Sequence, residues 1–92
     1  MPSYLVETYL SRDGAQEHAA RERRARPAGE ELTREDTRVR FERWIRIPED
    51  EICFFVFAAD SRRAAALAAL RAELDPIRVV EAVSSGNQKE KR

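Results

Sequence analysis

The stretch Glu49–Asp60, EDEICFFVFAAD, decides the fold, because it holds eight consecutive apolar residues, Ile52–Ala59, between acidic ends. A β-strand turns alternate side chains to opposite faces, so both faces of this segment need cover. In a chain of 92 residues the cover must come from few elements. The sequence therefore predicts a central strand that is buried on both sides.

Three further strands surround this segment. Val39–Ile47 alternates apolar and polar residues and predicts a strand joined to Ile52–Ala59 by a four-residue hairpin loop, Pro48–Glu51. Tyr4–Leu10 is rich in aromatic and β-branched residues and predicts a first strand, and Ile77–Val83 predicts a last one.

Two helices alternate with these strands. Small and apolar residues recur at helical spacing over 15–35 and keep their phase across Pro27, which predicts one helix kinked between Ala25 and Gly29. Asp60 and Ser61 are N-cap residues for a second helix over 62–74, which should end before Asp75-Pro76. Its apolar stripe is expected to be Ala64, Leu67, Leu70 and Leu74, with an Ala-rich flank that allows close approach to a sheet.

The element order βαββαβ favours a ferredoxin-like α+β sandwich, with four antiparallel strands and two helices on one face. We expect a single domain over 1–83. The polar tail, 84–92, is expected to be disordered.

The two helices leave one sheet face open. If Ile47 pairs with Ile52, Trp44 meets Phe55 and Glu42 meets Phe57 on one face. The other face then holds Ile45, Phe54 and Val56, and this nearly apolar set is expected under the helices. A one-residue slip would exchange the two faces. The open face, expected to bind a ligand or a second subunit, then carries Glu7, Tyr9, Glu42, Trp44, Arg46, Cys53, Phe55 and Phe57, beside Leu5.

Composition excludes several classes of partner. The chain has 17 basic and 17 acidic residues and no net charge, so no overall field draws it to nucleic acid or to a membrane surface. The arginine-rich segment around RERRARP also contains many acidic residues, as expected of a helix surface laced with ion pairs such as Glu17–Arg21. A single cysteine, with neither a targeting segment nor an apolar span, indicates a cytoplasmic protein.

Few residues could carry chemistry. The sequence has no phosphate-binding glycine loop, Ser/His/Asp set or metal-ligand doublet, and we predict no cofactor. His18 is interpreted as a solvated helix residue and Cys53 as a small buried hydrophobe. Glu7 interrupts an apolar strand, so it is either an acid/base group in an open-face pocket or one half of an ion pair with Arg46 or a partner subunit. Glu81 presents the same choice.

The segments YLVETYL, VRFERWIRIPEDEICFFVFAAD and LDPIRVVEAV, within residues 4 to 83, resemble a family of small bacterial domains that are common in actinobacteria. The family includes a protein described as nickel-binding. The resemblance implies a ferredoxin-like fold and a dimer through open sheet faces, as in dimeric α/β-barrel proteins. Where this chain has CFFVF, members of the family often carry a His or another polar residue, and no nickel ligand can be placed here residue by residue.

Three functions follow as hypotheses. The first is a homodimeric binding or sensing domain without catalysis, whose partners are a second copy of itself and a small molecule. The second is an enzyme of the dimeric α/β-barrel type that acts on a small apolar or aromatic molecule, with Glu7 as acid/base. The third, nickel binding, follows from the resemblance alone and requires His18, Cys53 and carboxylates to meet.

Overall fold

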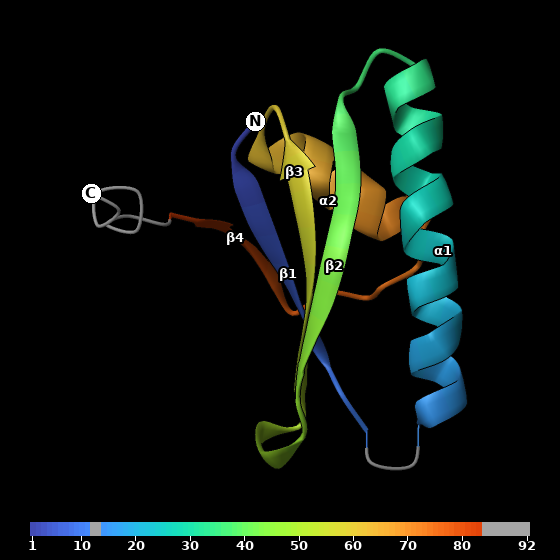
Figure 1. Cartoon of the computed structure of the whole chain (residues 1–92), viewed down its shortest axis with the longest axis vertical. Coiled ribbons are helices and arrows are strands. Elements are labelled where there is room, and N and C mark those ends of the chain that lie inside the picture. Colours follow the sequence, from blue (N-terminus) through green and yellow to red (C-terminus); the bar gives the residue numbers. More distant parts are fainter. Residues whose placement is uncertain (12–13, 84–92) are drawn as a thin grey trace, which may run out of the picture.

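The computed structural model describes residues 1–11 and 14–83 of the chain. It contains strand β1 (Ser3–Tyr9), helix α1 (Ala15–Arg34), strand β2 (Val39–Ile47), the short 3-10 turn η1 (Pro48–Asp50), strand β3 (Ile52–Ala59), helix α2 (Arg62–Arg71) and strand β4 (Arg78–Ala82) (Figure 1). The predicted bounds of β2 and β3 are confirmed, and those of β1 and β4 differ by one residue at each end.

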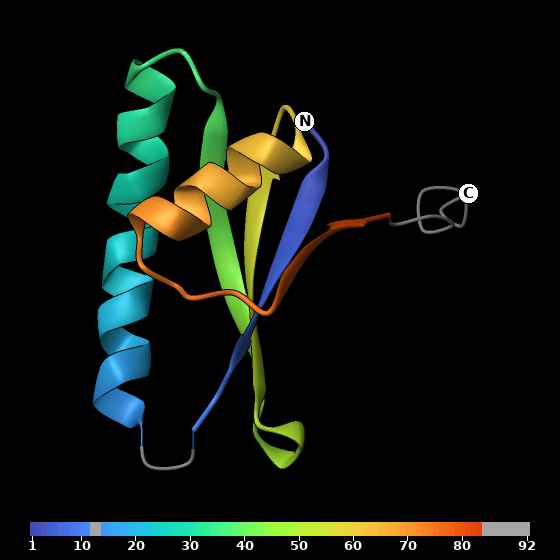
Figure 2. The ribbon, with the colours of Figure 1, turned by 180° about the vertical axis from the view of Figure 1, so that it is seen from behind.

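The strands form one antiparallel sheet in the order β2-β3-β1-β4. The two strands of each β-α-β unit are not neighbours in the sheet, because β3 lies between β1 and β2, and β1 lies between β3 and β4. This interleaving is the ferredoxin-like arrangement (Figures 1 and 2). The predicted fold class is confirmed. Strand β3 lies inside the sheet between β1 and β2, as its continuous apolar run requires.

A β-bulge interrupts the pairing of β2 with β3. Ile47 faces Ile52 and Trp44 faces Phe55, as predicted, but the register shifts between Phe41 and Arg43. Phe41 therefore faces Phe57, and the prediction that Glu42 does so is wrong. An extra residue in one strand reverses the side-chain alternation beyond it, so the two halves of β2 present their apolar residues to opposite faces.

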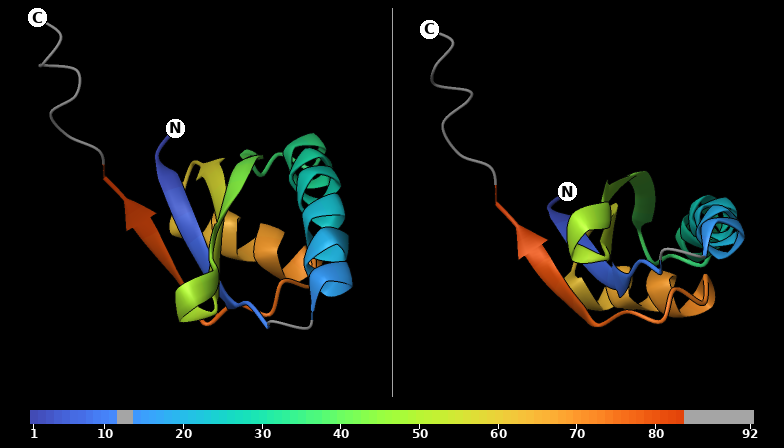
Figure 3. Two further views of the ribbon diagram at one scale, coloured as in Figure 1. Left: turned by 60° about the horizontal axis from the view of Figure 1, so that its bottom comes forward. Right: turned by 90° about the horizontal axis from the view of Figure 1, so that it is seen from below.

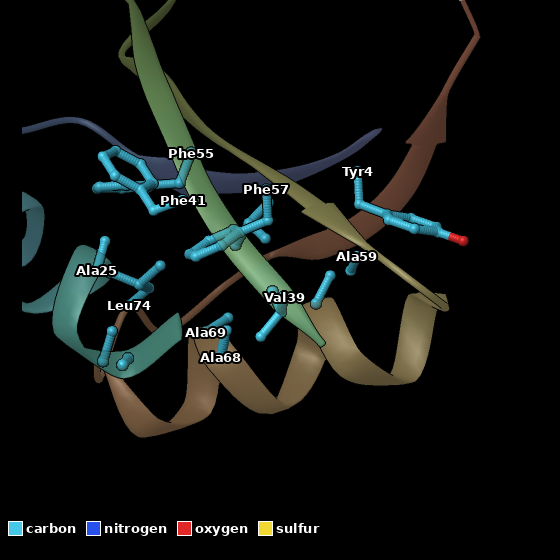
Figure 4. Close-up of a cluster of buried hydrophobic side chains, with 14 of the residues drawn as sticks. Tyr4, Ala25, Val39, Phe41, Phe55, Phe57, Ala59, Ala68, Ala69 and Leu74 are labelled. Atoms are coloured by element: carbon cyan, nitrogen blue, oxygen red, sulfur yellow. The ribbon is translucent and has the colours of Figure 1, made fainter. Parts of the chain in front are cut away.

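The main core lies between the helices and one face of the sheet. The alternate residues of β3 are fully buried there, namely Cys53, Phe55, Phe57 and Ala59. Figure 4 shows Phe55, Phe57 and Ala59 in this cluster. Phe41 packs edge-on against Phe57, with ring centroids 5.5 Å apart. Fully burying a phenylalanine side chain contributes on the order of 1.5–3 kcal/mol, so this cluster is the main source of stability.

Helix α2 lies across this face through its alanines. The Ser61 hydroxyl caps the helix by accepting a hydrogen bond from the Ala64 amide at 3.1 Å. The buried residues of the helix are Ala64, Ala65, Ala68 and Ala69. The predicted stripe is wrong at Leu70, which is 72% exposed, because short alanine side chains bring the helix closer to the sheet than a leucine ridge would allow.

Helix α2 ends at Arg71, three residues earlier than predicted. The chain then turns through positive φ values at Glu73 and Asp75, while Leu74 returns to the core. None of the described helices is both long and apolar enough to cross a membrane.

Helix α1 stands beside the outer strand β2, while α2 crosses behind the sheet (Figure 3). Ala25, Ala28 and Leu32 of α1 join the core. A Cβ on Gly29 would lie 3.2 Å from the Val39 carbonyl oxygen, so the missing side chain lets the helix approach the strand backbone. The helix runs without a break through Pro27 and Gly29, in agreement with the prediction of one helix rather than two (Figure 1).

Thr33 joins this helix to the strand edge. Its hydroxyl donates to the Val39 carbonyl oxygen at 2.9 Å and accepts from the Val39 amide at 3.2 Å. Edge strands expose unpaired backbone groups that invite further strands, and α1 closes this edge. The predicted tail, 84–92, lies outside the described residues.

A candidate interaction face

The five residues from Trp44 to Phe57 assigned to the open face lie on the other side of the sheet. The side chains of Cys53, Phe55 and Phe57 are fully buried among the helices, and Trp44 stacks on Phe55 with centroids 5.7 Å apart. Arg46 shares this face, and its guanidinium carbon lies 5.3 Å from the centroid of the Trp44 ring. Their assignment to the open face is wrong because both faces of β3 are apolar, and the bulge in β2 hid which of the two faces the helices cover. Val39 and Phe41, the apolar residues before the bulge, face the helices, whereas Ile45 and Ile47, after it, face away.

The open face carries its large apolar side chains in three rows of paired residues, and a fourth row, Arg40, Ala58, Ser3 and Ala82, borders them. The strand registers align Arg43, Val56, Leu5 and Val80 in the first row, Ile45, Phe54, Glu7 and Arg78 in the second, and Ile47, Ile52 and Tyr9 in the third. No described helix covers these rows (Figures 1 and 3). The predicted placement of Leu5, Glu7 and Tyr9 on this face is confirmed.

Glu7 forms an ion pair within the open face. Arg78 Nε donates to Glu7 Oε1 at 2.7 Å, and the Glu7 side chain is only 12% exposed. The ion-pair interpretation of Glu7 is confirmed, but its partner is Arg78 of β4 and not Arg46, since Arg46 lies on the opposite face. A paired carboxylate on a half-buried strand satisfies its charge without a ligand.

The two other polar residues predicted for this face have partners of their own. Tyr9 is 55% exposed, and its hydroxyl donates to Glu51 Oε1 at 3.0 Å. Glu42 falls at the bulge and pairs with Arg40 at 3.1 Å. Glu81 is exposed on β4, in register with Tyr4, and therefore does not share the face of Glu7.

His18 is buried, at 5% exposure, and its interpretation as a solvated residue is wrong. Its Nε2 lies 3.3 Å from the Ser11 carbonyl oxygen, and its ring centroid is 6.4 Å from that of Trp44. His18, Ala25 and Leu32 are seven residues apart and therefore share one helix face. The burial of His18 against the sheet could have been predicted from this spacing in the sequence.

Cys53 is a buried hydrophobe, as predicted. Burial raises the pKa of its thiol to about 11, which keeps it protonated at neutral pH and unsuited to nucleophilic or ligand chemistry. Within residues 1–11 and 14–83, no three His, Cys, Asp or Glu side chains are grouped so that they could hold a metal ion. The nickel hypothesis therefore gains no support from the placement of His18 and Cys53.

Sequence reasoning missed Ile45, Phe54 and Val80 as members of the open face. Glu42-Arg43, a polar pair inside an alternating strand, was the available signal for a bulge. Two adjacent polar residues break the period of two and shift the apolar positions that follow.

No protein-family model matches the chain, and no curated protein or solved structure does so either. The functional reading therefore rests on the geometry of this molecule. A sheet face that is apolar along β2, β3 and β1, with one internal ion pair, is suited to binding a flat surface.

Proposed function

We propose that the protein is a small cytoplasmic binding domain without catalytic activity, and that it forms a homodimer through the open sheet face. The observation that carries the proposal is the uncovered patch around Ile45, Phe54 and Leu5. Ile45, on the outer strand β2, is 38% exposed. A second copy covers such a patch most completely, because a two-fold axis makes one surface complementary to itself.

The size of the face sets the expected strength. Four strands spaced about 4.8 Å apart and six residues at about 3.3 Å each give a face of roughly 400 Å². Stable interfaces bury about 800 Å² per partner, so this face supplies about half of that area. The proposed dimer is therefore dissociable, with an affinity in the micromolar range.

The charge of Glu7 on this face is already neutralised within the chain, which lowers the cost of burying the face against a second copy. Glu7 already has its charge balanced by Arg78, so the pair enters an interface without an unpaired carboxylate. Glu7 has no free role as an acid or base in this arrangement, and the catalytic alternative gains no support from its geometry.

Phe54→Glu tests the proposal. Phe54 is half-buried at the centre of the face, and a glutamate there would place an unpaired charge between the two copies. We expect the dimer dissociation constant, measured by sedimentation equilibrium, to rise at least about 100-fold.

Leu70→Glu is the matched control, because Leu70 is an exposed leucine of α2 that lies away from the open face. It should dimerise like the wild type. A wild-type chain that stays monomeric at high micromolar concentration would overturn the proposal, and so would equal weakening by both variants. Phe55→Glu is unsuitable, since Phe55 is part of the core.

A further inference from the structure

An arginine-rich cavity lies where α1 meets the edge strand β2. Its volume is about 450 Å³, within the range of small-molecule sites. Four arginines line the cavity: Arg26 and Arg34 from α1, Arg38 from the loop before β2, and Arg40 from β2. The lining contains a single carboxylate, Glu30. The whole chain has no net charge, so this local excess of positive charge distinguishes the cavity from the rest of the surface.

Among the described residues, two of the four arginines lie in no ion pair, although Arg34 acts electrostatically on its neighbour Glu35. Arg40 pairs with Glu42 at 3.1 Å, and Arg38 lies 3.8 Å from Asp60. Arg26 and Arg34 form no ion pair with any residue in the described part of the chain. Their guanidinium groups are therefore available to an external anion.

The inner wall of the cavity is apolar. Val39 and Phe41 form its floor, but they are only 2% and 3% exposed, so the accessible apolar surface comes from Met1 and from the methylene stems of the arginines. The guanidinium carbon of Arg26 lies 5.4 Å from the centroid of the Phe41 ring, a cation–π arrangement that orients the fork. Met1 adds a flexible apolar side chain at the rim. An anion that fits these surfaces needs an apolar body as well as a charge.

We infer that this cavity binds a small organic carboxylate with an aromatic or aliphatic body. Its carboxylate pairs with the lining arginines, of which Arg26 and Arg34 have no ion-pair partner among the described residues, and its body lies against Met1 and the methylene stems of the arginines. Guanidinium forks match a carboxylate in two-point hydrogen bonds, and the apolar lining adds contact area for an organic body, which phosphate lacks. The inference names the ligand class for the binding role proposed above and rests on that role. All lining residues belong to one protomer, so occupancy does not require the dimer.

The test uses 4-phenylbutyrate as the probe, followed by amide NMR shifts of the full chain. We expect saturable shifts at residues 26–34 and 38–41. Arg34→Gln and Arg26→Gln should each weaken binding about tenfold, the effect of losing one charged hydrogen-bond partner. Arg23→Gln is the matched control, an exposed arginine of the same helix that does not line the cavity.

Two comparison ligands sharpen the result. The neutral amide, 4-phenylbutyramide, should bind at least about tenfold more weakly than 4-phenylbutyrate if the arginines recognise the negative charge of the carboxylate. Inorganic phosphate should not compete at equal concentration if the apolar body is needed. Equal binding of the amide, equal binding of phosphate, shifts scattered over the chain, or no saturation at millimolar probe would each overturn the inference.

The dimer proposal and this inference fail separately. Monomeric Phe54→Glu should still bind 4-phenylbutyrate, and Arg34→Gln should sediment like the wild type. A failed dimer therefore leaves the ligand titration interpretable.

Discussion

At the scale of single residues, Cys53 shows how packing determines chemistry. Its side chain is fully buried in β3, and the Thr8 hydroxyl donates to its carbonyl oxygen at 3.3 Å. Desolvation disfavours the thiolate, and the pKa of the thiol rises from 9.0 to about 11. The thiol therefore acts as an apolar filler.

This raised pKa makes stability depend on alkaline pH. A group that holds its proton more tightly when folded stabilises fully below its unfolded pKa, and that contribution is lost as pH rises from about 9 to about 11. We expect the free energy of unfolding to fall by about 2 kcal/mol over this interval because of Cys53. Chemical denaturation at both pH values would measure the loss.

Cys53→Ala is the control, since it removes the titrating group and leaves the other alkaline titrations in place. The alkaline loss should be smaller in this variant by the contribution of Cys53. Identical losses in the two proteins would show that the thiol ionises as easily in the folded chain as in the unfolded one.

At the scale of elements, the hydrophobic pattern located the strands better than it oriented them. The bounds of β2 and β3 follow from local alternation and turn residues, which depend on the strand itself. The face of each residue in β2 depends on a single inserted residue at Glu42, and the alternation of Ile45 and Ile47 looks the same with or without it. The pairing of Ile47 with Ile52 was predicted correctly, but it does not tell which apolar face of β3 the helices cover. The open-face aromatics were therefore misassigned as a group.

The end of α2 shows the same limit. Leu74 continues a helical stripe in the sequence, but the chain leaves the helix at Arg71 and brings Leu74 to the core by a turn. Tertiary packing outweighs local propensity at this site, and the sequence pattern of one segment does not contain that information. The burial of His18 differs, because its helical spacing from Ala25 and Leu32 was present in the sequence.

The junction of α1 with the edge of β2 gives a test at this scale. Thr33→Val keeps the shape of the side chain but removes both hydrogen bonds to Val39. We expect a loss of about 1–3 kcal/mol in the free energy of unfolding, because two backbone groups of the strand edge lose their partner. Thr33→Ser, which keeps the hydroxyl, should recover most of this loss. If the serine variant is no more stable than the valine variant, the hydroxyl does not tie the helix to the strand.

At the scale of the whole molecule, the fold follows from the order of elements, but assembly does not. Six regular elements in the order βαββαβ lead to the ferredoxin-like sheet because few compact alternatives bury a doubly apolar strand such as β3. What covers the second sheet face depends on surfaces beyond this chain. The arginine cavity could not be foreseen either, because its lining comes from α1, β2 and the first residue of the chain.

Dimerisation should couple to thermal stability. A partner that binds only the folded chain raises the melting temperature as protein concentration rises. For a domain of this size we expect an increase of about 3–5 °C per tenfold rise in concentration above the dissociation constant. Scanning calorimetry over two decades of concentration would measure it. Phe54→Glu should melt at a temperature independent of concentration, and a wild type that does the same would contradict the dimer.

The closed edge at β2 also limits how copies of this chain could add strand to strand. The Thr33 side chain occupies the outward backbone groups of Val39, so that side of the sheet is blocked near its start. At the opposite border β4 is paired with β1 on one side only, among the described residues. Fibril growth needs two compatible borders on every molecule. With α1 beside β2 (Figure 1), β4 is the border left for edge-to-edge addition among the described residues, and pairing through β4 alone ends after two molecules.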